Sequence, residues 1–132
     1  MKHAGGCHCG NVAFEFEAPD EVTVYQCNCS ICELTAYQHL IIPTDHFKLL
    51  TPDTNLSSYS FNTGIAQHYF CLRCGIKSWY IPRSNPDGVS VNFRCVAKST
   101  FTRFDLQPFD GQNWEANASA LVRLSHSDKQ SP

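Results

Sequence analysis

The sequence predicts one mainly β domain, a β-sheet domain stapled by zinc and closed by a short C-terminal helix. Most of the chain divides into short segments in which apolar and polar residues alternate with the period of two that β-strands require. Seven of the eight cysteines fall into three tight clusters, a pattern typical of zinc sites. A helical spacing of apolar residues is clear only near the C-terminus.

Composition limits the possible partners. With 10 Lys and Arg against 12 Asp and Glu, the formal net charge is −2, so no basic surface for nucleic-acid phosphates is expected. No segment approaches the roughly 20 apolar residues of a membrane span, and residues 1–6 lack the apolar core of a signal peptide. We expect a single cytoplasmic domain over residues 1–124 and a flexible tail over 125–132, with neither nucleic acid nor membrane as a partner.

Two strands are predicted in the first part of the chain, at residues 11–17 and 22–26. In the first, Val12, Phe14 and Phe16 share one face, as in a half-buried strand. The second is rich in β-branched and aromatic residues and ends directly before Cys27.

A short helix is predicted immediately after this strand. Ser30 and Glu33 have the spacing of a capping box, in which Ser30 would cap the helix and Glu33 would bond back to its amide. Cys29 and Cys32 would then lie at the positive end of the helix, which favours thiolates. The alternative is a plain Ser-type turn.

The remaining elements follow from alternation and turn residues. We expect a hairpin around Asn62-Thr63-Gly64, and a loop over residues 98–111, where the periodicity is poor. The best long-helix candidate covers Trp114 to Leu124. Further strands are expected at residues 37–42, 46–50, 57–61, 66–70, 76–81 and 89–95.

The clustered cysteines are interpreted as zinc ligands. In a reducing compartment disulfides are uncommon, and the spacings do not match those usual for iron–sulfur clusters. Cys7 and Cys9 with Cys71 and Cys74 make a closed four-cysteine site, which leaves three ligands elsewhere. That second, three-ligand site would leave one coordination position open, as catalytic zinc sites do. Its members are Cys27, Cys29 and Cys32.

Two alternatives remain open. Cys95 could close the second site as a fourth ligand, which would make both zinc ions structural, although its alternating apolar segment favours a role in core packing. His39 and His68 could move protons near neutral pH, while a simple hydrogen-bonded histidine is the commoner role for each.

Three motifs resemble those of the glutathione-dependent formaldehyde-activating family, and the resemblance extends from about Gly6 to Trp114. The motifs are Gly6-Cys7-His8-Cys9-Gly10, Cys27-Asn28-Cys29-Ser30-Ile31-Cys32 and Phe70-Cys71-Leu72-Arg73-Cys74-Gly75. The segments at residues 46–50, 59–63 and 82–86 are similar to the branch that includes the domain of centromere protein V.

The resemblance implies an Mss4-like fold with two zinc ions per chain, one structural and one catalytic. It also implies a carbon–sulfur lyase activity of the S-(hydroxymethyl)glutathione synthase type, with a small thiol such as glutathione or an aldehyde adduct as the partner. The catalytic site would consist of Cys27, Cys29 and Cys32. Glu33 replaces the basic residue usual in glutathione-using members, and an acidic group at the mouth of the site would repel glutathione.

Overall fold

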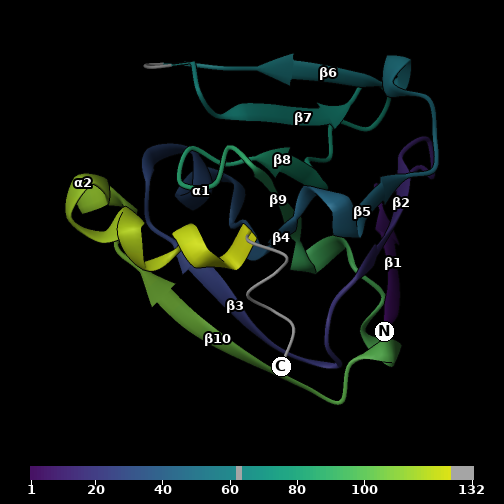
Figure 1. Ribbon diagram of the computed structural model, residues 1–132. Helices are drawn as coiled ribbons and strands as arrows, with labels where there is room; N and C mark the ends of the chain where they lie inside the picture. Colours follow the sequence, from purple (N-terminus) through teal and green to yellow (C-terminus); the bar gives the residue numbers. More distant parts are fainter. Residues whose placement is uncertain (62–63, 126–132) are drawn as a thin grey trace.

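The computed structural model describes residues 1–61 and 64–125 as two β-sheets joined by short helical segments (Figure 1). The smaller sheet has the order β1-β2-β5, and its neighbouring strands are antiparallel. Its strands are β1 (Lys2–Gly6), β2 (Ala13–Glu17) and β5 (Phe47–Leu49). The prediction of a mainly β chain is confirmed.

The larger sheet has seven strands in the order β10-β3-β4-β9-β8-β7-β6. Every neighbouring pair is antiparallel except β10 and β3, which run parallel. The strands are β3 (Glu21–Cys27), β4 (Gln38–Pro43), β6 (Leu56–Tyr59), β7 (Gln67–Cys71), β8 (Trp79–Ile81), β9 (Gly88–Asn92) and β10 (Arg103–Phe109).

The apolar core lies between β2 of the small sheet and the centre of the large sheet. Phe14 and Phe16 are almost completely buried and pack in one cluster with residues of β3, β4 and β9. The predicted inward face of the first segment is therefore confirmed. β4 and β9 are buried along their whole length because both faces of the large sheet are covered there.

Two strands, β1 and β10, were not predicted from the sequence. β10 lies in the segment expected to be a loop, and six of its seven residues are exposed at the sheet edge, so no burial alternation marks it. Its parallel register places Phe109 beside Cys27. β1 begins at Lys2 and contains two glycines, which weaken any strand signal.

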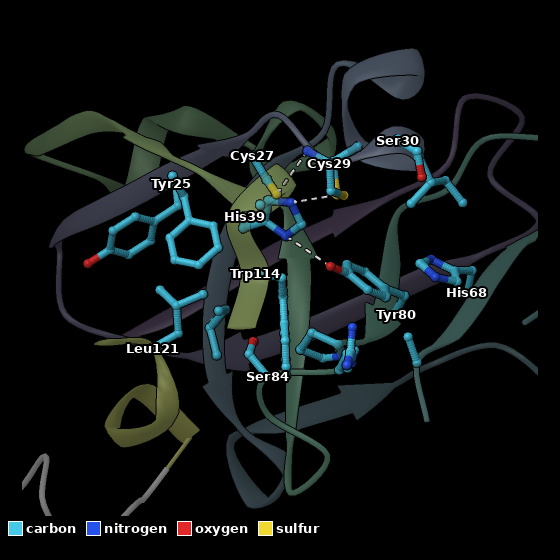
Figure 2. A pocket seen from close by; sticks show the side chains of 18 of the residues that line it. Tyr25, Cys27, Cys29, Ser30, His39, His68, Tyr80, Ser84, Trp114 and Leu121 are labelled. Carbon is cyan, nitrogen blue, oxygen red and sulfur yellow. Dashed lines mark hydrogen bonds between the residues drawn. The ribbon is translucent and has the colours of Figure 1, made fainter. Parts of the chain in front are cut away.

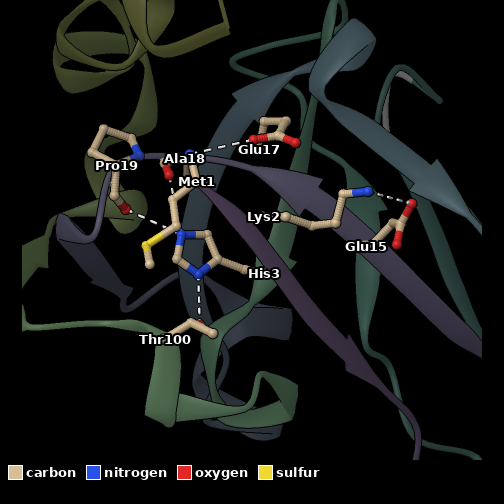
Figure 3. A network of polar contacts seen from close by, with 8 residues as sticks. All are labelled: Met1, Lys2, His3, Glu15, Glu17, Ala18, Pro19 and Thr100. Carbon is tan, nitrogen blue, oxygen red and sulfur yellow. Dashed lines mark hydrogen bonds and ion pairs between the residues drawn. The ribbon is translucent and has the colours of Figure 1, made fainter.

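A buried histidine holds β1 in place. The His3 side chain is 1% exposed; its Nε2 is 3.1 Å from the carbonyl oxygen of Ala18 and its Nδ1 is 2.6 Å from the Thr100 hydroxyl (Figure 3). The ring also stacks on Phe101 at 3.9 Å between centroids. These contacts connect the first strand to the segment after β9. The alternation of apolar and polar residues cannot predict such a long-range interaction.

The C-terminal helix is shorter than expected. α2 covers only Trp114–Asn117, and the chain continues as two 3-10 turns instead of the predicted helix to Leu124. The Asn85 amide donates to the carbonyls of Leu121 and Val122, which stabilises the irregular backbone there. The remaining helical segments are α1 (Ser30–Thr35), η1 (Thr44–His46), η2 (Asp53–Asn55), η3 (Phe93–Cys95), η4 (Lys98–Thr100), η5 (Gly111–Asn113), η6 (Ala118–Ala120) and η7 (Val122–Ser125).

Ser125 was expected to be the first residue of a flexible tail. Ser125 belongs to η7 and is buried, so it is not the first residue of a tail. The rest of the expected tail, residues 126–132, lies outside the described residues, as do Asn62 and Thr63 of the predicted hairpin turn. Within the described residues, no helix has the length and apolar character needed to cross a membrane.

Candidate metal centres

The first cysteine cluster has the geometry of a zinc site. The sulfurs of Cys7, Cys9, Cys71 and Cys74 all lie within 4.8 Å of one another. Cys9 Sγ is 3.7 Å from Cys7 Sγ and 3.6 Å from Cys71 Sγ. Tetrahedral zinc with bonds of about 2.3 Å places neighbouring sulfurs about 3.8 Å apart. The structure thus brings together the four cysteines that the sequence grouped, and their chemistry and spacing fit zinc.

Backbone amides surround these sulfurs. The amides of Arg73 and Cys74 donate to Cys71 Sγ at 3.3 and 3.4 Å, and the amide of Val12 donates to Cys7 Sγ at 3.2 Å. The hydrogen bond from the Cys74 backbone is the largest cause that lowers the pKa of Cys71, to about 6. A deprotonated thiol is the form that binds metal. The cluster connects the β1–β2 hairpin of one sheet to the end of β7 in the other.

The second cluster differs from the predicted triplet: its donor group contains Cys27, Cys32 and His39, and Cys29 is not part of it. Cys27 ends β3, Cys29 precedes α1 and Cys32 lies in its first turn. His39 of β4 joins them, and its Nε2 is 3.2 Å from Cys32 Sγ. The donor atoms of Cys27, Cys32 and His39 lie within 4.8 Å of one another, a set of two sulfurs and one imidazole that also fits zinc.

The predicted capping box is wrong. The N-cap of α1 is Cys29, not Ser30, and no side chain caps the helix. Cys29 and Cys32 nevertheless lie at the helix N-terminus, as expected. Hydrogen bonds from the thiols of Cys27 and Cys32, followed by backbone amides at Cys32 and Ile31, lower the pKa of Cys29 far below its ordinary value. A lowered pKa favours the thiolate of Cys29, the form that binds metal.

His39 is fixed by hydrogen bonds on its other ring nitrogen. Nδ1 lies 2.9 Å from Ser90 Oγ and 3.2 Å from the Tyr80 hydroxyl. Burial lowers the pKa of His39 to about 3, so the ring is neutral. A neutral imidazole held by a hydrogen bond on one nitrogen is the usual form of a metal ligand or of a residue that orients one. Sequence reasoning missed this role because it depends on the antiparallel pairing of His39 with Tyr25, two residues before Cys27.

A cavity of about 390 Å³ opens beside the triplet. Residues of β3, α1, β4, β7, β8 and the segment after β10 line it, and Figure 2 shows Cys27, Cys29 and His39 around the same space as Tyr80, His68 and Trp114. The lining is mostly apolar and aromatic, with a few polar groups, which is typical of small-molecule sites.

The corner after β10 packs directly against the cysteines. A Cβ on Gly111 would lie 2.3 Å from Cys27 Sγ and 2.9 Å from the Cys29 side chain, so this position requires glycine. Asn28, between the two cysteines, accepts a hydrogen bond from the Gln112 amide at 3.0 Å and donates to Asp110 at 3.2 Å. The segment expected to be a loop thus forms one wall of the site.

The structure changes the expected surroundings of two residues, Cys95 and Glu33. Cys95 lies in η3 instead of a strand, and it belongs to neither of the donor groups found among the described residues. Burial raises the pKa of its thiol to about 11. Glu33 is exposed on α1 and is not part of the cavity lining, so it does not stand at the mouth of the site.

Comparison with known proteins agrees with this arrangement. The family model described as "Glutathione-dependent formaldehyde-activating enzyme" matches residues 2–113. Among solved structures, a crystal structure of a Rhodobacter sphaeroides protein is 29% identical and has a TM-score of 0.65. The match covers 79% of this chain and 99% of that one.

Proposed function

Because the chain belongs to the glutathione-dependent formaldehyde-activating enzyme family, we propose that it is a zinc-dependent, carbon–sulfur lyase-like enzyme. The proposed reaction joins a small thiol and an aldehyde, as S-(hydroxymethyl)glutathione synthase does, in a reducing compartment such as the cytoplasm. One observation carries the proposal: two cysteine sulfurs and an imidazole meet beside a cavity that Cys29 also lines, while the other clustered cysteines are gathered in a separate group.

Cys27, Cys29 and Cys32 would hold the catalytic zinc, and His39 would orient Cys32 through the contact at 3.2 Å. Zinc bound there would supply Lewis acidity and lower the pKa of a substrate thiol. The apolar and aromatic side chains of the cavity would exclude water around the reacting groups. Ser90 and Tyr80 would keep the His39 ring in one orientation.

Arg83 suggests that the thiol carries a carboxylate. This residue lines the cavity, and its guanidinium stacks on Trp114 at 3.7 Å from the ring centroid. Its present partner is Glu115, at 2.7 Å, whose side chain is 82% exposed. A substrate carboxylate could take the place of this exposed group. Because Glu33 lies outside the cavity lining, the repulsion of glutathione expected from the sequence has no basis there.

We expect Arg83→Gln to raise KM for glutathione about tenfold with little change in kcat, because a charge-assisted hydrogen bond to the substrate is lost. Cysteamine, a thiol without a carboxylate, serves as the matched substrate and should show no change. An equal rise in KM for both thiols, or no rise for glutathione, would show that Arg83 does not bind a carboxylate.

The proposed function is tested with zinc-loaded protein, formaldehyde and a panel of thiols that includes glutathione, cysteine and cysteamine. These adducts also form without catalyst, so the readout is the exchange rate between free thiol and adduct, measured by NMR. We expect acceleration with at least one thiol, and none with Cys27→Ser. If protein carrying two zinc ions accelerates no thiol–aldehyde pair, the proposal is wrong.

A second candidate function follows from His39. If its Nε2 were a fourth ligand, the second zinc would be closed and both sites would be structural. The domain would then be a zinc-stapled protein-interaction module. The segments that resemble the centromere protein V branch favour this alternative, and the metal content of variants distinguishes the two, as described in the Discussion.

A further inference from the structure

His68, in the wall of the cavity, has a buried ring nitrogen that makes no hydrogen bond among the described residues. The residue lies on β7, is 3% exposed and lines the cavity beside the cysteine triplet (Figure 2). Its Nδ1 is 2.7 Å from Lys77 Nζ, whereas its buried Nε2 has no hydrogen-bond partner among the described residues. A buried polar atom without a partner is costly, and in a cavity wall it points to a ligand.

The contact with Lys77 determines where the ring proton lies. A lysine ammonium group has three donors and no acceptor, so Nδ1 of His68 must accept. Burial and the Lys77 charge lower the pKa of His68 to about 4, and the ring therefore carries a single proton at neutral pH. That proton must be on Nε2. The cavity wall thus contains a buried, neutral N–H group that has no acceptor among the described residues.

The surroundings hold this ring in one orientation. It stacks on Tyr80 with 4.7 Å between centroids and an angle of 11°, and on Phe61 at 5.6 Å. The hydroxyl of the same Tyr80 contacts His39, which in turn contacts Cys32. Tyr80 therefore connects His68 to the residues of the second candidate metal site.

Lys77 is placed to resupply a proton. Its ammonium lies over the ring of Tyr80 at 3.9 Å and over that of Tyr37 at 4.8 Å. Burial lowers its pKa to about 8, and the electrostatic influence of the cysteine triplet opposes this shift. Lys77 is still mostly protonated at pH 7, but it releases a proton more readily than an exposed lysine.

We propose that His68 is a catalytic residue whose Nε2–H donates to the oxygen of the aldehyde, with Lys77 as the proton source behind it. This inference rests on the proposed function. As the thiolate sulfur forms a bond to the carbonyl carbon, the electron pair of the C=O π bond moves to the oxygen. The oxygen takes the proton from Nε2 while Lys77 gives one to Nδ1, so both residues end neutral. The thiol proton leaves to solvent. The resting state returns when solvent protonates Nε2 and Nδ1 gives its proton back to Lys77.

The variants His68→Phe and His68→Gln separate donation from packing. Phenylalanine keeps the stack with Tyr80 and Phe61 but has no donor, so kcat should fall by about 10² to 10⁴ with little change in KM. Glutamine offers an acceptor to Lys77 and an N–H to the cavity but cannot relay a proton. The kcat of His68→Gln should therefore lie between that of wild type and that of His68→Phe. Lys77→Met should lower kcat and remove the decline of rate above about pH 8 that we expect for wild type, because wild-type Lys77 loses its proton there.

Zinc content and the thermal midpoint are measured for each variant, so that a folding defect is recognised. NMR of the histidine ring nitrogens in the free wild-type protein provides a readout independent of turnover. We expect the His68 proton on Nε2 at pH 7. A proton on Nδ1, or a kcat for folded His68→Phe within about threefold of wild type, would overturn the inference.

A pair of stable ligands separates this inference from the proposed function. S-(2-hydroxyethyl)glutathione carries a hydroxyl where S-propylglutathione carries a methyl group. Wild type should prefer the hydroxyl ligand, and His68→Phe should lose that preference. If wild type turns over no thiol–aldehyde pair, the proposed function fails, and the ligand pair still decides whether His68 donates to a ligand oxygen. A wild-type protein without the preference would contradict that role.

Discussion

Cys71→Ser is expected to leave the chain unfolded at room temperature. The Cys71 side chain is 1% exposed, and its sulfur lies at the centre of the cluster that joins the β1–β2 hairpin to β7. Structural zinc sites contribute an apparent free energy of about 10–16 kcal/mol in small domains, comparable to the whole stability of a folded domain. Circular dichroism with zinc analysis by mass spectrometry would measure the loss of fold and metal together.

Cys95→Ser is the matched control for this change. Cys95 is also a partly buried free thiol, but it lies outside both donor groups of the described residues. The variant should keep two zinc ions and unfold within a few degrees of wild type. Equal thermal midpoints for Cys71→Ser and Cys95→Ser would contradict a structural role for the first cluster.

The parts of the fold that could be predicted are those with a one-sided burial pattern. Val12, Phe14 and Phe16 alternate with polar residues because β2 has one face on the core and one outside it. β10 could not be predicted in this way, because an exposed edge strand buries neither face. Its existence depends on pairing with β3, a partner more than 70 residues away, and local sequence does not encode such pairing.

In the candidate site, too, some features could be predicted from the sequence and others could not. The cysteines could be grouped from spacing because ligands within a knuckle must be close in sequence to face one ion. His39, Gly111 and Arg83 come to the triplet from other strands and turns, so their roles depend on register and on the close approach of the β10 corner. Glu33, although next to Cys32 in sequence, lies outside the cavity lining because successive helix residues point in different directions.

Cys32→Ser and His39→Gln together decide whether the second metal site is open. Cys32→Ser should lose one of two zinc ions and reduce activity more than 10³-fold, because the metal supplies most of the chemistry. Its thermal midpoint should fall far less than that of Cys71→Ser, since the second cluster joins β3 and β4, two neighbouring strands of one sheet, and the helix α1 between them. Metal content, activity and thermal unfolding are measured on the same samples.

His39→Gln tests the role of the imidazole. Nε2 lies 3.2 Å from Cys32 Sγ, a normal distance for an N–H···S hydrogen bond and shorter than the about 3.6 Å expected between nitrogen and sulfur on one tetrahedral zinc. A glutamine can still donate to the sulfur, so this variant should retain both zinc ions. Loss of the second zinc from His39→Gln, as complete as from Cys32→Ser, would instead make His39 the fourth ligand. The site would then be closed, and the interaction module would replace the enzyme as the better account of this domain.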